Sequence, residues 1–374
     1  MAPAEGRPSG GFTIGPDAPA SDSLPQSVSA EVAAQLRTGD AAAAVGAAER
    51  ARESYNGALR IARSSGDAAG QVVAHQRLGD SLAQQGLFAQ AVTHLLQGLS
   101  LARSLPDRAP LADLLNTFSF LHWRKGDLAM ALEYNDQLQT LAGELGDLRR
   151  GADALLMAGN ICYTQGAIPA AIDSYAQAEA LFVQLGVEDQ RLRAISNLAA
   201  AHLEVADYPA AERASLIVVE AATARGDLLN VAYGRLNLAK SLCHLGRTDE
   251  ALGLCLAAQR HLEGANDLLG QVGVLEALGD IYAVQGKRLG ASLLYEKGLS
   301  LAKELGEVRS LVQLHRRLGD LAQRSGQVPV AKQHFAAALA GAEELGHAGL
   351  CRDLGDLLAA LGGRAVSAPG AAQR

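Results

Sequence analysis

Alanine recurs eight times at a spacing of 40 residues, and this period constrains the fold more than any other feature of the sequence. The alanines are Ala51, Ala91, Ala131, Ala171, Ala211, Ala251, Ala291 and Ala331. One glycine column has the same period: Gly46, Gly86, Gly126, Gly166, Gly246, Gly286 and Gly326, with Ala206 in its one gap. Another comprises Gly66, Gly146, Gly186, Gly226, Gly306 and Gly346, with Pro106 and Asn266 in its gaps. Three columns in one register predict stacked structural repeats.

Each period contains two amphipathic helices. In residues 268–307, apolar side chains recur at helical spacing from about 268 to 285, and Gly286 ends this first helix. A second helix with a broad apolar stripe follows and ends at Gly306. Two such helices cannot bury their apolar faces alone, so neighbouring repeats must stack.

The residues between the helices support this division. Asn266 replaces glycine where a left-handed conformation is needed, and asparagine tolerates that conformation best after glycine. Pro106 ends a helix by another route, because it lacks an N–H and clashes with the preceding turn. Aspartates follow the second glycine column and can cap the next helix. They are Asp67, Asp107, Asp147, Asp227 and Asp267.

The pattern L-G-x-x-Y followed by a fixed alanine resembles the tetratricopeptide repeat. Leu278, Gly279, Tyr282, Ala291 and Tyr295 stand at the spacings of that motif. The 40-residue period is similar to the long-helix class of kinesin light chains, Gα-regulating adaptors and bacterial peptide-sensing regulators. The resemblance implies an all-α, right-handed superhelical solenoid of about eight helix-turn-helix repeats over residues 28–361.

The two ends of the chain are expected to differ from the repeats. Residues 1–27 are rich in Pro, Gly, Ser and Ala, which predicts a disordered arm. The first repeat could turn at Gly39 or Gly46, and the period favours Gly46. Residues 348–361 have leucines at helical spacing and are expected to form a capping helix. Residues 362–374 are expected to form a flexible tail.

Composition excludes several classes of function. The formal net charge of −7 argues against a general nucleic-acid binder, which needs a basic face. No run of 18 apolar residues exists, and the N-terminus does not resemble a signal peptide. The four cysteines form no C-x-x-C pair, which favours free thiols in a reducing cytoplasm. The abundance of Ala, Gly and Arg over Lys hints at a GC-rich bacterium.

The resemblance implies that the first helix of each repeat lines a concave face that binds a partner. Helical spacing places one stripe of each first helix toward this face. In the third repeat the stripe includes Phe120 and Trp123, which are typical binding anchors. The alternative for Trp123 is a place in the local core. The matching stripes of the third to sixth repeats, along which we expect the partner to bind, also include Asn116, Leu156, Asn160, Tyr163, Arg193, Tyr233, Leu236 and Lys240.

Asparagines are a second indication of a binding site. Asn197 and Asn237 occur as N-L-A in successive repeats. In the adaptor and peptide-sensor relatives, asparagine at this position hydrogen-bonds the backbone of an extended peptide, for which an amide offers both donor and acceptor. The resemblance implies this role for Asn197 and Asn237. We further expect Asn160 to bind peptide backbone, and Arg193 and Lys240 to pair with partner carboxylates. The alternative is a set of solvated helix positions.

No catalytic or metal constellation emerges. His122, Cys162 and His202 share one phase of the repeat, but helices 8–10 Å apart would have to bring three side chains to one point. No cofactor is expected. We therefore expect a cytoplasmic, non-catalytic scaffold or adaptor that binds a peptide or partner segment, with no nucleic-acid or membrane partner. The alternative is a regulatory receptor for a signalling peptide that controls a separate output domain or transcription regulator.

Overall fold

The computed structural model describes residues 24, 25 and 27–362. The remaining residues of the predicted disordered arm (1–27) and of the predicted flexible tail (362–374) lie outside the described residues. Contacts divide the described residues into two compact units. The N-terminal compact unit comprises residues 24–161, except 26, and 173–194, while the C-terminal compact unit comprises 162–172 and 195–362.

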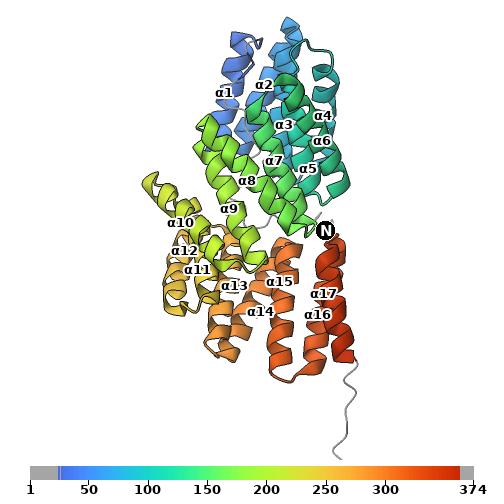
Figure 1. Cartoon of the computed structure of the whole chain (residues 1–374). Coiled ribbons are helices and arrows are strands. Elements are labelled where there is room, and N and C mark those ends of the chain that lie inside the picture. The colour runs from blue at the N-terminus through green and yellow to red at the C-terminus, as the bar shows by residue number, and fades with distance from the viewer. Residues whose placement is uncertain (1–23, 26, 363–374) are drawn as a thin grey trace, which may run out of the picture. The chain divides into compact units, whose positions relative to one another are not determined.

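The described residues form helices joined by short connections, with no strand among them, which confirms the predicted all-α fold. Consecutive helices run antiparallel as hairpins (Figure 1). The first helices of the eight repeats are α1 (Ala30–Ala44), α3 (Ala68–Gln84), α5 (Ala109–Arg124), α7 (Leu148–Thr164), α9 (Glu188–Glu204), α11 (Leu228–His244), α13 (Leu268–Val284) and α15 (Val308–Arg324). The second helices are α2 (Ala48–Ser65), α4 (Phe88–Ala102), α6 (Leu128–Leu145), α8 (Ile168–Leu185), α10 (Tyr208–Ala224), α12 (Thr248–Gly264), α14 (Arg288–Leu305) and α16 (Val328–Glu344). A last helix, α17 (Ala348–Gly362), packs against α16.

The helix ends follow the local chemistry of the sequence. Every glycine of the two columns has a positive φ, and Asn266 adopts the same left-handed conformation with φ of 52°. Ala206 is the other non-glycine with positive φ, at 57°. Helix α1 continues through Gly39, and the first repeat turns at Gly46, as the period predicts. The carboxylate of Asp267 accepts a hydrogen bond from the Gly270 N–H at 2.9 Å, so it caps α13.

The junction of α4 and α5 departs from the repeat. Helix α4 already ends at Ala102, and Arg108 rather than Asp107 precedes α5. Asp107 instead accepts a hydrogen bond from the Ala109 N–H at 2.9 Å. Asp107 therefore satisfies the N–H of the first residue of α5, whereas Asp267 satisfies an N–H of the third residue of α13. Proline at 106 cannot donate the hydrogen bond that closes the regular turn, so the connection is longer here.

The core of each repeat is built around the alanine column. All eight alanines are 0% exposed, so helices approach closely at these points. Larger side chains from neighbouring helices fill the space between the alanines, as Phe335 does in α16 with Leu350 and Leu354 of α17. Helix α17 covers the last repeat. No helix among the described residues is long and apolar enough to span a membrane.

Candidate functional site

The predicted site residues in the N-terminal compact unit are mostly packed. Trp123 is 7% exposed and contacts a cluster of Ala131, Met157 and Ile161, with Phe120 partly buried beside it. Of the two alternatives given for Trp123, a binding anchor or a place in the local core, the structure favours the local core. The physical reason is that each first helix has neighbours on two sides, which leaves only a narrow stripe open.

Other predicted residues are also engaged within the fold. The side-chain oxygen of Asn160 accepts a hydrogen bond from the Tyr175 hydroxyl at 2.9 Å. Tyr233 donates its hydroxyl to the Asp267 carboxylate. The remaining buried members are Asn116, Leu156, Asn197 and Leu236. Arg193 is half-buried. A part for these residues in binding stays a prediction.

Three predicted residues come together in the C-terminal compact unit. Tyr163, Asn237 and Lys240 line a cavity of about 290 Å³. We call it the α9–α15 cavity, because most of its walls come from α9, α11, α13 and α15. Its other lining residues are Ala200, Leu203, Glu204, Ala206, Tyr208, His244, Leu269, Glu276, Asp280, Glu307, Arg309, Ser310, Gln313, Arg316 and Arg317.

Ion pairs stabilise one wall of this cavity. Lys240 Nζ lies 2.9 Å from the Glu276 carboxylate, and Arg317 Nε lies 2.9 Å from that of Asp280. Tyr295 donates its hydroxyl to the same Asp280 at 2.6 Å. Burial alone would raise the pKa of Glu276, but the charges of Lys240 and Arg317 outweigh it, and the pKa lies below its usual value. Glu276 is therefore a buried carboxylate held in its charged form.

Two buried hydrogen-bond donors of the cavity, on Asn237 and Arg309, have no partner among the described residues. Asn237 is 2% exposed, and its amide nitrogen has no partner among the described residues. The Arg309 guanidinium lies 4.7 Å above the Tyr163 ring, and its Nε atom is buried without a hydrogen bond. Arg316 forms no ion pair with any residue that the structure describes. Buried donors are normally satisfied, so such a group calls for an acceptor from outside the chain.

The α13 and α15 walls of this cavity lie outside the predicted binding face. That face comprised the third to sixth repeats, whereas Glu276 and Asp280 belong to the seventh and Arg309 and Arg316 to the eighth. A signal was available in the sequence. Glu276 and Asp280 occupy the repeat positions of Leu236 and Lys240, and a change from apolar to acidic at one position of the first helix marks a polar site.

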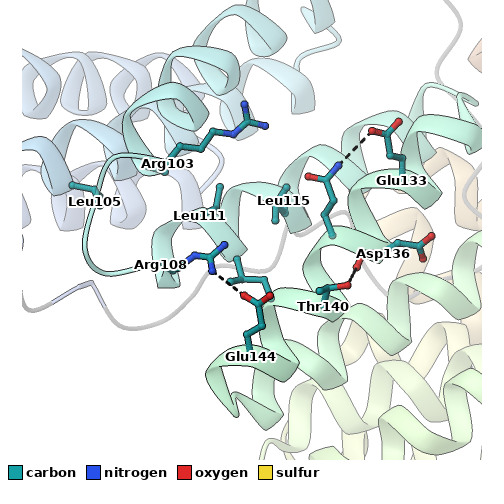
Figure 2. A pocket seen from close by; sticks show the side chains of 12 residues that line it. Arg103, Leu105, Arg108, Leu111, Leu115, Glu133, Asp136, Thr140 and Glu144 are labelled. Atoms are coloured by element: carbon teal, nitrogen blue, oxygen red, sulfur yellow. Dashed lines mark hydrogen bonds and ion pairs between the residues drawn. The ribbon is translucent and has the colours of Figure 1, made fainter.

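A second cavity, of about 660 Å³, lies in the N-terminal compact unit at the irregular junction after α4. Its floor is apolar and includes Leu111 and Leu115 (Figure 2). Its charged rim is tied together internally, since Arg108 lies 2.8 Å from the Glu144 carboxylate. It contains none of the predicted site residues. Pro106, the exception in the second glycine column, was the sequence signal for this irregularity.

The three residues that share one phase of the repeat, His122, Cys162 and His202, are the candidate metal ligands of the sequence. The two histidines lie near aspartates of their own repeats instead. His122 Nδ1 lies 3.2 Å from Asp127, and His202 Nδ1 lies 3.6 Å from Asp207. Cys162 is half-buried, and burial raises the pKa of its thiol. Within the described part of the chain, no three histidine, cysteine or carboxylate side chains are grouped as metal ligands.

No family model matches the sequence, and no curated protein matches it significantly. Solved structures with the same fold do exist. A Rap protein complexed with competence and sporulation factor has a TM-score of 0.61 at 15% identity, over 89% of this chain and 98% of that one. Apo RapI has a TM-score of 0.63 at 9% identity, over 74% and 98%. NprR in complex with its cognate peptide NprX has a TM-score of 0.58 at 15% identity, over 76% and 82%. A tetratricopeptide repeat protein from Parabacteroides merdae has a TM-score of 0.52 at 17% identity, over 78% and 98%. The chain therefore has the fold of tetratricopeptide repeat proteins.

Proposed function

We propose that this protein is a non-catalytic interaction protein that binds an extended peptide or partner segment in the α9–α15 cavity. The observation that carries the proposal is the unpartnered amide nitrogen of Asn237, buried in a cavity that Tyr163 and Lys240 also line. A peptide carbonyl would satisfy this donor, and a bound backbone needs such directional partners.

The comparisons support a peptide as the occupant. Two of the solved structures with this fold are described as complexes, one with competence and sporulation factor and one with the peptide NprX. The lining of the cavity offers hydrogen-bond donors, ion pairs and an aromatic ring. It lacks the assembled nucleophile, base and oxyanion donors that catalysis requires. The four free thiols favour a reducing compartment, and we place the protein in the cytoplasm.

A receptor for a signalling peptide is the second candidate. The same binding step would then control an output outside this chain. It is favoured by the likeness to structures described as a Rap protein with competence and sporulation factor and as the quorum sensor NprR. Both candidates require the α9–α15 cavity to bind a peptide.

A test begins with selection of binders from a phage-displayed library of random dodecapeptides. The affinity of selected peptides for wild type and for Asn237→Ala is then measured by fluorescence polarisation. We expect the variant to bind about tenfold more weakly, because one hydrogen bond in a desolvated site is worth about 1 to 1.5 kcal/mol. Asn56→Ala is the matched control, because Asn56 is an exposed asparagine of α2. Equal affinity of both variants, with unchanged melting curves, would exclude Asn237 from the site.

A further inference from the structure

The side chains along one face of α15 supply much of the α9–α15 cavity wall. Arg309, Gln313, Arg316 and Arg317 lie at spacings of four, seven and eight residues, which places them on one side of a helix. Three of these four carry a guanidinium. Arginine is the side chain best suited to a planar carboxylate, because its donors match the two oxygens.

Of the three arginines that line the cavity, Arg317 is the one that forms an ion pair with a described carboxylate. It pairs with Asp280 at 2.9 Å and lies 3.8 Å from Glu276. Arg309 and Arg316 form no ion pair with the residues that the structure describes. Arg309 is nevertheless held in place, because its guanidinium stacks on Tyr163, whose hydroxyl donates to Glu204 at 3.2 Å.

The carboxylates of the cavity already have roles in the fold. Glu276 and Asp280 accept from Lys240, Arg317 and Tyr295. Glu307 caps α15, accepting from the Ser310 N–H at 3.1 Å and from its hydroxyl at 2.8 Å. The lining residues include four basic and four acidic side chains, so formal charge alone does not select a ligand. Hydrogen bonding distinguishes the basic from the acidic side chains, because the carboxylates named above are bound within the protein. Donors of Asn237 and Arg309 have no hydrogen-bond partner among the described residues.

We infer that the occupant of the α9–α15 cavity is a peptide with acidic side chains, whose carboxylates are bound by Arg309 and Arg316. This inference rests on the proposed function and adds the chemical class of the ligand. Arg309 and Arg316 are seven residues apart on α15, about 10 Å along its axis. Aspartate or glutamate side chains along a peptide can supply a separate carboxylate to each guanidinium at this spacing, and a peptide without a free terminal carboxylate can therefore still bind.

The experiment uses the full chain and the same phage library, in which the peptides are fused at their C-terminus and carry no free terminal carboxylate. We expect selection on wild type to enrich aspartate and glutamate. Selection on Arg309→Gln and on Arg316→Gln should lose this enrichment. Arg324→Gln is the matched control, because Arg324 is exposed at the end of the same helix and does not line the cavity.

The selected peptides are then synthesised with blocked ends. Replacing their acidic residues by the corresponding amides should weaken binding to wild type at least tenfold and should change binding to Arg309→Gln much less. Added salt should weaken wild-type binding, because the charges are only partly buried. Tight binders without acidic residues would overturn the inference and leave the proposed function standing. A library that yields no binder would count against both.

Discussion

At the residue scale, a small residue on the first helix of a repeat faces a large side chain on the second helix. A Cβ atom added to Gly319 would lie 2.6 Å from the Phe335 ring, and one added to Gly279 would lie 2.3 Å from Tyr295. Where the equivalent position is Ala239, the facing residue is the smaller Cys255. The space between the two helices of a repeat therefore holds one large side chain facing a glycine, or two small side chains. We expect Gly319→Ala to lower the free energy of unfolding by about 1 to 3 kcal/mol, because the ring cannot move away.

The same substitution in a Phe335→Cys background is the control for this prediction. There the pair copies Ala239 and Cys255, so the clash is gone. Alanine is also a better helix former than glycine by about 1 kcal/mol, so the second substitution should be neutral or stabilising there. Urea denaturation of the four proteins in the double-mutant cycle measures the coupling. An equal cost of Gly319→Ala in both backgrounds would show that the two side chains do not compete for space.

At the element scale, two helical hairpins carry the same histidine pair, six repeat periods apart, in which His75 is buried and the other three rings are half-buried. Nδ1 of His75 in α3 lies 3.1 Å from that of His94 in α4, and Nδ1 of His315 in α15 lies 2.9 Å from that of His334 in α16. Burial, the second imidazole and Arg63 lower the pKa of His75 to about 4. Burial also lowers the pKa of the other three.

These shifts predict a loss of stability in mild acid. Because the folded-state pKa is lower than the unfolded value of about 6.5, the unfolded chain binds more protons between these values. The free energy of unfolding is therefore undiminished above about pH 6.5 and decreases as the pH falls toward 4. Protonation of His75 accounts for about 3 kcal/mol of this decrease. Urea midpoints at pH 7.5 and 5 measure the loss. His75→Gln should lose less stability than wild type between these two pH values. The control His261→Gln, which lies outside both pairs, should lose as much as wild type. An identical loss in wild type and both variants would show that His75 is not the group responsible.

Most helix boundaries could be predicted from sequence, because they depend on local chemistry. Gly286 ends a helix through its own backbone, and Asp267 caps one through its own side chain. The α9–α15 cavity could be predicted only in part. Spacing identified Asn237 and Lys240 on the first helices, but the burial of Trp123 depends on contacts with neighbouring repeats that periodicity does not specify.

At the scale of the whole molecule, stability should be distributed along the stack of repeats. In a solenoid it approximates a sum of repeat stabilities and interfaces between neighbours, so damage at one end stays local. Leu354 of α17 is 0% exposed and packs with Phe335 in the last repeat. Leu354→Ala should cost about 2 to 5 kcal/mol by leaving a cavity there. Leu289→Ala removes the same atoms from a side chain that is 85% exposed and should cost far less.

Hydrogen exchange followed by mass spectrometry shows where this cost appears. In Leu354→Ala, amides of α15 to α17 should exchange faster than in wild type, because the last repeat opens without its covering helix. Amides of α1 to α4, in the N-terminal compact unit, should keep their wild-type rates. Faster exchange along the entire chain would mean that the repeats unfold as one cooperative body. Helix α15 belongs to the last repeat and also forms one wall of the α9–α15 cavity. Leu354→Ala should therefore weaken peptide binding only to the extent that α15 opens, so that binding depends on the capping helix α17.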